Sequence, residues 1–292
     1  MINGLSRLVM KVHYVLTVPV STIFILNSKR LHPAYRMTLA RKLWLGLRMF
    51  RNTLRIPTGT SYKSHLAMAL KLLETAPDVA GDVVECGSWK GGSASNLSLV
   101  CQIVGRRLMV YDSFEGLPEE VPGDREATHY SKGDYCGTLD EVRSNVQRYG
   151  AIDQCEFVQG WFKDTLPGLN TPVLLAFLDV DLEASLETCV RHIWPRLVEQ
   201  GYVFIDEVVG VDYCALFYSE TYWRKYFHRA PPGLIGAGAG LPLGEYYIGP
   251  WSDRDAYPMQ HANAGAYTRK DLTGFWTYYP ESLPQAAANL ER

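Results

Sequence analysis

The sequence predicts an α/β protein in which helices cover both faces of a mostly parallel sheet. Short apolar runs alternate with stretches of helical periodicity between residues 82 and 205, a pattern typical of strand–helix–strand units. The chain has 292 residues, of which 47% are apolar and 21% charged, so it can bury one large core. We therefore expect one α/β domain over residues 61–292, preceded by an N-terminal extension over residues 1–60.

Periodicity places the main elements of this domain. Leu66, Ala69, Leu70 and Leu73 recur at helical spacing before Pro77 and predict the first helix. Helices are also expected from residues 93, 139 and 182, and an aromatic one near 217–227. The expected strands are residues 82–86, 108–111, 155–158, 173–178, 202–205 and a last one around 245–248.

The helix expected from Leu182 has the clearest pattern. Its apolar stripe continues through Leu186, Val190, Ile193 and Leu197, while charged residues lie off the stripe. Gly201 follows as the expected C-terminal stop of this helix.

Composition excludes some classes of protein. A net charge of −2 gives no electrostatic reason to expect a nucleic-acid partner. The six cysteines form no CxxC pair and no Cys/His cluster, so neither a zinc site nor a disulfide framework is expected. These features favour a protein of the reducing cytoplasm.

The N-terminal extension contains one nearly continuous apolar run, residues 12–26, followed by Lys29, Arg30 and Arg36. This run is shorter than the ~20 apolar residues that span a bilayer, and it contains Pro19. Three interpretations stay open: peripheral contact with a membrane surface, packing against the domain, and a contact in a homo-oligomer.

Ligands of open parallel sheets bind beyond the carboxyl ends of the strands. The first such end is Glu85-Cys86-Gly87, followed by Gly91, Gly92 and Ser93. Glycines would let the backbone approach a ligand closely, and Ser93 is expected to cap the next helix. A tight strand-to-helix turn without a ligand would also explain these glycines.

The second expected strand ends in Asp112, 25 residues after Gly87. Such sheets place the carboxylate that binds ribose hydroxyls at this point. The position indicates a nucleoside and leaves open both NAD and S-adenosylmethionine, whereas an aspartate that only caps a turn is the alternative.

Four motifs together resemble the macrocin O-methyltransferase (TylF-like) family. In chain order they are VVECGSWKGGSA, VYDSFEGLP, QGWFKDTLP and FLDVDLEASLETCVRHIWPRLVEQGYVFIDE, within residues 60–210. The resemblance implies a Rossmann-like class I methyltransferase with a seven-stranded sheet whose final strand is antiparallel. It also implies S-adenosylmethionine as cofactor and a sugar hydroxyl, in a small-molecule or glycan acceptor, as the methylated group. By position, the resemblance assigns to the cofactor Glu85, Gly87, Ser93, Asp112, Ser113 and Trp161.

Four acidic residues follow two of the expected strands: Asp179 and Asp181 follow residues 173–178, whereas Asp206 and Glu207 follow residues 202–205. If the strands are neighbours, the carboxylates repel one another unless a cation lies between them. Oxygen ligands favour Mg²⁺. We assign Asp179, Asp206 and Glu207 as metal ligands and Asp181 as the general base, with the roles of Asp179 and Asp181 interchangeable.

The chain departs from the family pattern at Glu207, where a second aspartate is usual. Glutamate is longer by one methylene group and could ligate through water or not at all. Metal-independent transfer to a small molecule is therefore an alternative, as is a non-catalytic binding subunit. An NAD-dependent enzyme would leave the acidic cluster without a role.

Two further segments of the chain contain glycines. Residues 116–137 form a polar loop that could close over an acceptor, with His129 and Tyr130 as its best contacts. Gly236, Gly238 and Gly240 do not lie between a strand and a helix, so we interpret them as a loop and not as a nucleotide-binding motif.

Overall fold

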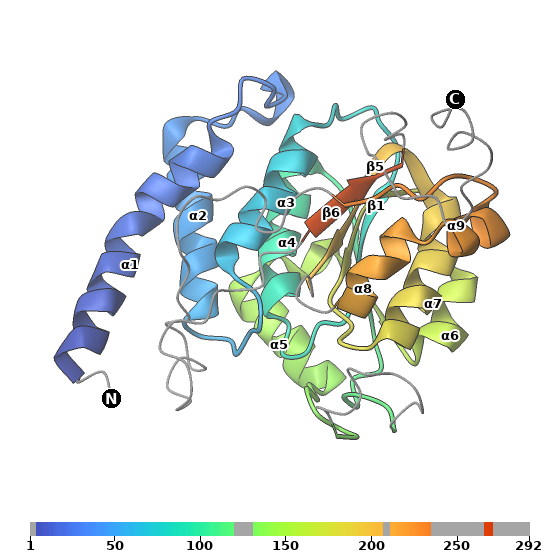
Figure 1. Ribbon diagram of the computed structural model, residues 1–292. Coiled ribbons are helices and arrows are strands. Elements are labelled where there is room, and N and C mark those ends of the chain that lie inside the picture. Colours follow the sequence, from blue (N-terminus) through green and yellow to red (C-terminus); the bar gives the residue numbers. More distant parts are fainter. Residues whose placement is uncertain (1–3, 120–130, 207–210, 235–265, 271–292) are drawn as a thin grey trace, which may run out of the picture.

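The computed structural model describes residues 4–119, 131–206, 211–234 and 266–270, and it confirms the predicted α/β fold (Figure 1). Its six-stranded sheet has the order β3-β2-β1-β4-β5-β6. The first five strands pair in parallel, whereas β6 pairs antiparallel with β5, as the resemblance implied. The strands are β1 (Asp82–Cys86), β2 (Leu108–Asp112), β3 (Cys155–Gln159), β4 (Val173–Leu178), β5 (Leu197–Ile205) and β6 (Ala266–Arg269). Seven strands were expected, and the strand predicted near 245–248 lies outside the described residues.

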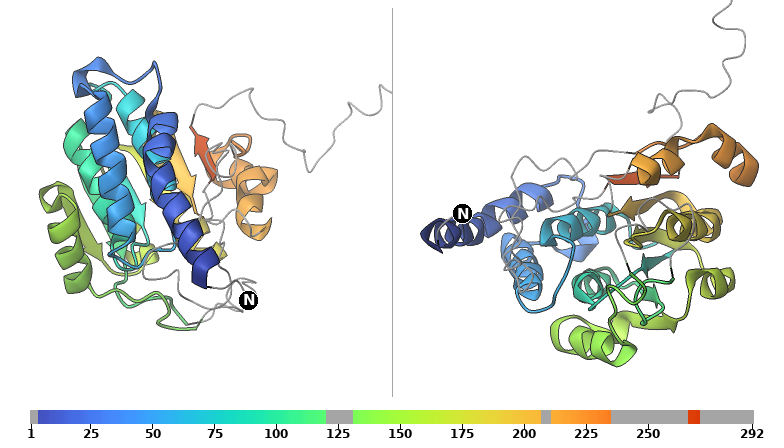
Figure 2. Two further views of the ribbon diagram at one scale, coloured as in Figure 1. Left: turned by 90° about the vertical axis from the view of Figure 1, so that its left-hand side faces the viewer. Right: turned by 60° about the horizontal axis from the view of Figure 1, so that its bottom comes forward.

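Helices cover both faces of the sheet (Figures 1 and 2). One layer contains α1 (Gly4–Leu26), α2 (Leu39–Thr53), α3 (Tyr62–Glu74), α4 (Gly92–Val104) and α5 (Leu139–Tyr149). The other contains α6 (Phe162–Thr165), α7 (Glu183–Ile193), α8 (Val211–Ala215) and α9 (Glu220–Phe227). Alternate strand residues point to opposite layers, so Val83 belongs to the core under α1–α5 and Val84 to the core under α7–α9.

The N-terminal helices share the core of the sheet. Leu26 of α1 and Leu45 and Met49 of α2 are completely buried in the same cluster as Phe177 of β4. No helix within the described ranges is long and apolar enough to cross a membrane. The N-terminal extension therefore packs as a helical layer on the α/β domain.

The helix after β4 ends earlier than the sequence indicated. It stops at Ile193, residues 194–196 form a 3-10 turn, and β5 begins at Leu197. Pro195 explains the difference, because its ring removes a backbone donor and blocks the helical path. Gly201 thus lies inside β5, and its prediction as a helix stop was wrong.

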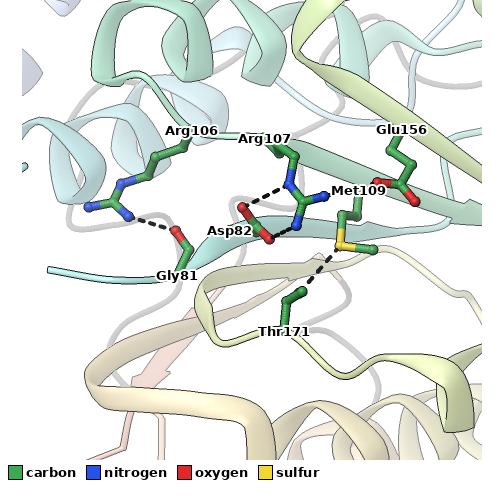
Figure 3. A network of polar contacts seen from close by, with 7 residues as sticks. All are labelled: Gly81, Asp82, Arg106, Arg107, Met109, Glu156 and Thr171. Carbon is green, nitrogen blue, oxygen red and sulfur yellow. Dashed lines mark hydrogen bonds and ion pairs between the residues drawn. The ribbon is translucent and has the colours of Figure 1, made fainter.

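Two arginines fix the amino-terminal edge of the sheet, opposite the predicted site (Figure 3). The Arg106 guanidinium donates to the carbonyl oxygens of Gly81 at 2.6 Å and Val79 at 2.7 Å. Arg107, half-exposed, pairs with Asp82 at 2.6 Å and so joins the starts of β1 and β2. An exposed pair of this kind contributes at most about 1 kcal/mol. The buried Arg106 contacts therefore matter more to this edge.

Candidate functional site

The predicted site residues form one row at the carboxyl edge of the sheet. The parallel ladder extends one residue past the strand ends through backbone N–H to carbonyl hydrogen bonds of 2.9–3.1 Å: Gly160 to Asp112, Gly87 to Tyr111, Asp179 to Cys86, and Asp206 to Leu178. Neighbouring strands lie about 4.8 Å apart. The structure therefore brings Asp112, Gly87, Asp179 and Asp206 side by side in this order.

The glycines of the turn after β1 make room for other parts of the chain. Gly87 has a φ of 84°, and a Cβ there would overlap the carbonyl oxygen of Asp179. A Cβ on Gly91 would lie 3.0 Å from Val142 of α5, and one on Gly92 would lie 2.9 Å from Thr58. Close approach of chain segments thus explains these three glycines without a ligand.

The predicted helix cap at Ser93 was wrong. The N-cap of α4 is Gly91, with a φ of 78° and no side-chain hydrogen bond, and Ser93 lies inside the first turn. The left-handed backbone at Gly91 starts the helix two residues earlier than a serine cap would. Ser93 is buried, and its hydroxyl faces Glu85 instead.

Asp112 ties the ends of β1 and β2 together. Its Oδ2 accepts from the Ser88 N–H at 2.7 Å and from the Ser88 hydroxyl at 3.1 Å, and its Oδ1 accepts from the Phe114 N–H at 2.7 Å. Burial nevertheless raises the pKa of Asp112 above its usual value. Sequence reasoning missed Ser88, although its place directly after Gly87 was a usable signal.

Glu85 is completely buried at the end of β1. Burial raises its pKa to about 8, and the carboxylates of Asp179 and Asp112 act in the same direction. The Ser93 hydroxyl lowers that pKa in part, yet neither carboxylate oxygen makes a hydrogen bond of normal geometry to a described residue. A buried group of this kind costs folding free energy, so its presence points to a function.

Asp181 has a left-handed backbone, with a φ of 57°, directly before α7. Burial raises the pKa of its carboxyl group to about 7, and the nearby Asp112 carboxylate adds to the effect. Non-glycine residues rarely adopt this conformation, and such residues gather at active sites. Trp89, after β1, and Phe114, after β2, have the same left-handed backbone conformation, with φ values of 44° and 57°.

Ser113 and Trp161 flank Asp112. The buried Ser113 hydroxyl donates to the Gly116 carbonyl at 2.9 Å and accepts from the Glu115 N–H at 3.1 Å. Trp161 follows Gly160, whose N–H bonds to the Asp112 carbonyl, and it is the N-cap residue of α6. Both residues thus lie at the same edge as Asp112.

The structure describes two of the three predicted metal ligands. Asp179 and Asp206 follow neighbouring strands, and Asp206 is buried at 5% exposure. Glu207 lies outside the described residues. Within them, no group of three His, Cys, Asp or Glu side chains could hold a metal ion. Oxygen donors from Asp179 and Asp206 suit a hard cation in kind, but two residues do not complete a site.

The two ends of the loop over residues 116–137, the predicted lid, lie beside the turn after β1. Gly133 donates to the Leu117 carbonyl at 2.9 Å, and Leu117 donates to the Asp134 carbonyl at 2.8 Å. The Tyr135 ring meets the Trp89 ring edge-on, with centroids 5.3 Å apart. The lid residues His129 and Tyr130 lie outside the described residues, as do the glycines at 236, 238 and 240.

The fold is similar to that of solved Rossmann-like methyltransferase structures. The solved structure of the O-methyltransferase NovP superposes with a TM-score of 0.52 at 23% identity, covering 88% of this chain and 99% of that one. The structure of CalS11, a calicheamicin methyltransferase, superposes with a TM-score of 0.51 at 18% identity. This match covers 87% of this chain and 91% of that one.

Sequence comparison then defines the family. The family model of macrocin-O-methyltransferase (TylF) matches residues 58–228, and the chain belongs to this family, which confirms the resemblance.

Two curated relatives are similar over part of their length. The 8-demethyl-8-(2,3-dimethoxy-alpha-L-rhamnosyl)-tetracenomycin-C 4'-O-methyltransferase of Streptomyces olivaceus is 39% identical over 52% of this chain and 65% of its own. The demethyldecarbamoylnovobiocin O-methyltransferase of Streptomyces niveus is 33% identical over 47% and 56% of the two chains. The chain thus spans less than two thirds of the length of these relatives.

Proposed function

We propose that this protein is an S-adenosylmethionine-dependent O-methyltransferase that methylates a hydroxyl group of a sugar or a glycosylated acceptor. The observation that carries the proposal is the row of Asp112, Asp179 and Asp206 at one sheet edge, together with the buried Glu85, in a member of this family. S-adenosylmethionine carries an ammonium and a sulfonium group, so a carboxylate-rich edge complements its charge. Membership of the TylF family supports the same cofactor.

The cofactor half of the site comprises the residues around β1 and β2. We assign Glu85 to the ammonium group, because its two buried oxygens make no other normal hydrogen bond among the described residues. Asp112 receives the ribose hydroxyls, and Gly87, Ser93, Ser113 and Trp161 line the rest of the cofactor. When bound, S-adenosylmethionine supplies an electrophilic methyl group.

The acceptor half lies at the ends of β4 and β5. A sugar hydroxyl attacks well only as it loses its proton, so a base must lie beside it. We assign this role to Asp181, whose position between β4 and α7 lies next to the row of acids. Asp179, Asp206 and Glu207 are the residues that would hold Mg²⁺, and the ion would lower the pKa of the bound hydroxyl. The metal-independent alternative follows if Glu207 does not ligate.

The acceptor class comes from the relatives. Their names describe O-methylation of a rhamnosyl-tetracenomycin and of demethyldecarbamoylnovobiocin, and the first of these compounds carries a sugar. A comparable acceptor here would require a cover, for which residues 116–137 are the candidate. A glycosylated small molecule is therefore the first acceptor to test.

Titration calorimetry with S-adenosylhomocysteine and with NAD tests the cofactor assignment. Binding of S-adenosylhomocysteine alone supports the proposal, whereas preferential binding of NAD overturns it. A screen of glycosylated acceptors and sugar nucleotides with methyl-labelled cofactor then tests the activity. Cofactor binding without transfer to any acceptor of this screen favours a non-catalytic binding subunit.

A further inference from the structure

A polar hollow lies between α2 with the turn that follows it and the end of α5. Its volume is about 230 Å³, and its lining residues are Arg48, Arg51, Asn52, Arg55, Arg148 and Tyr149. Four of these six side chains carry a guanidinium group, and none of the six is acidic. This arginine pocket is not used by the methyl-transfer site.

Contacts to Tyr149 hold the pocket together. The Arg48 guanidinium and the Asn52 amide each donate to the Tyr149 carbonyl oxygen at 3.2 Å. The guanidinium groups of Arg55 and Arg148 lie 5.8 and 5.3 Å from the centre of the Tyr149 ring. Within the described part of the chain, no ion pair joins any of the four arginines to a carboxylate.

Four uncompensated cations around one hollow repel one another, and an anion relieves the repulsion. Guanidinium groups match phosphate oxygens in a two-pronged geometry that lysine cannot provide. The hollow is smaller than the ~300–1,000 Å³ of typical pockets for whole small molecules. Its size and charge therefore fit a phosphate or diphosphate group at the end of a larger ligand.

The pocket is separate from the methyl-transfer edge. The first two turns of α5 reach the turn after β1, because Glu141 pairs with Lys90 at 2.7 Å and Asn145 donates to the Lys90 carbonyl at 2.9 Å. Tyr149 lies eight residues beyond Glu141 and four beyond Asn145, which corresponds to about 12 and about 6 Å along a helix. None of the residues that line the pocket is assigned to the methyl-transfer site. A ligand in the arginine pocket would therefore bind apart from the cofactor.

The surface beside the pocket is apolar and basic. On α2, Trp44 and Leu47 are exposed and lie four residues before the pocket residues Arg48 and Arg51, so these four share one face. The exposed Leu54 and Arg55 follow in the turn after the helix. Leu47 is 50% and Trp44 47% exposed. The first 73 residues contain twelve Lys and Arg and no Asp or Glu. Basic helices with exposed apolar residues are typical of surfaces that contact anionic membranes.

We propose that the arginine pocket binds a phosphate group, and that the source of this group is the headgroup of an anionic phospholipid. The apolar residues of α2 then contact the acyl region beside the headgroup. This inference is independent of the proposed methyl transfer. It differs from the membrane contact that the sequence left open, because that contact involved residues 12–26, whereas this one involves α2.

The test uses the full chain and two probes: inorganic pyrophosphate in calorimetry, and phosphatidylcholine vesicles with and without phosphatidic acid in co-sedimentation. The Arg51→Gln/Arg148→Gln variant is expected to bind both pyrophosphate and anionic vesicles at least tenfold more weakly. The matched control, Lys29→Gln/Arg36→Gln, loses the same charge outside the pocket and is expected to stay within threefold of the wild type. The Arg51→Lys/Arg148→Lys variant keeps the charge and is expected to lose part of the pyrophosphate affinity.

The Leu47→Ser variant separates the two parts of the proposal, because it is expected to weaken vesicle binding and leave pyrophosphate binding unchanged. Pyrophosphate binding without vesicle binding would support the pocket and overturn its lipid source. Equal loss in the pocket variant and its charge control, or no binding of either probe by the wild type, would overturn the pocket itself.

Discussion

The Asn96 amide donates a hydrogen bond to His65 Nδ1 at 2.8 Å, and both side chains are completely buried. Since Nδ1 accepts, the ring proton lies on Nε2, which donates to Thr60 at 2.8 Å. On the other side, Asn52 donates to Asn96 at 2.8 Å. This chain of side chains links α2, α4 and α3, and burial lowers the pKa of His65 to about 3.

The first prediction concerns the pH dependence of stability. The folded state keeps His65 neutral, whereas the unfolded state protonates it below about pH 6.5. Its contribution is therefore fully present above pH 6.5 and is lost as the pH falls toward 3. One such group contributes a slope of up to about 1.4 kcal/mol per pH unit. We expect urea unfolding of His65→Gln to show a shallower loss of unfolding free energy between pH 6.5 and 4.5 than the wild type.

The partly exposed His32 provides the control for this measurement, since His32→Gln removes a histidine outside the network. It should retain the wild-type slope. Equal slopes for the wild type and His65→Gln would mean that His65 titrates alike in the folded and unfolded states.

The second prediction concerns Asp112, which organises the turn after β1 as well as being assigned to the ribose. Asp112→Ala removes the acceptor of three hydrogen bonds, so we expect affinity for S-adenosylhomocysteine to fall at least tenfold in calorimetry. Ser88→Ala removes only the 3.1 Å hydroxyl contact and keeps the backbone one. The affinity of Ser88→Ala for S-adenosylhomocysteine should fall less than fivefold. If Ser88→Ala lost as much affinity as Asp112→Ala, the Ser88 hydroxyl contact would be the main contribution of Asp112 to binding.

The sequence predicted what depends on local pattern. Strand ends at Asp112, Asp179 and Asp206 follow from apolar runs that stop at an acid, and their alignment follows from parallel pairing. The end of α7 was misjudged because Leu197 continues the helical stripe, although Pro195 prevents the helix from continuing.

Long-range contacts could not be predicted in this way. The Asn96–His65 bond joins residues 31 positions apart, and the arginine pocket joins α2 to residue 148. Neither spacing has a sequence signature. The need for a glycine at position 87 is a further example. It arises from the nearby Asp179 carbonyl, and this proximity follows only once β1 and β4 are known to be neighbours.

The third prediction tests Asp181 as the base. Asparagine tolerates the left-handed backbone that Asp181 adopts, so Asp181→Asn should fold and bind S-adenosylhomocysteine like the wild type. Without the carboxylate, we expect kcat to fall by roughly 10²–10⁴-fold in the methyl-transfer assay. The exposed Asp153→Asn serves as the control and should keep full activity. Unchanged kcat in Asp181→Asn would transfer the role to Asp179.

The fourth prediction concerns the metal. Treatment with EDTA should abolish methyl transfer, and added Mg²⁺ should restore it. Asp206→Asn weakens a ligand without changing its shape, so its activity should require a higher Mg²⁺ concentration. Full activity in EDTA would favour the metal-independent alternative.

The last prediction compares two glycines with similar backbones. Gly87 and Gly105 have φ values of 84° and 70°, but only Gly87 faces another part of the chain, since nothing lies within 4 Å of a Cβ on Gly105. Gly105→Ala should therefore lose only the ~1–2 kcal/mol that a left-handed L-residue costs. Gly87→Ala must also displace the Asp179 carbonyl, which adds roughly 1–3 kcal/mol. It should show a lower Tm than Gly105→Ala, and because Asp179 follows β4 in the row of acids, only Gly87→Ala should also weaken S-adenosylhomocysteine binding. Equal Tm values for the two variants would mean that the turn after β1 moves away from β4 at little cost.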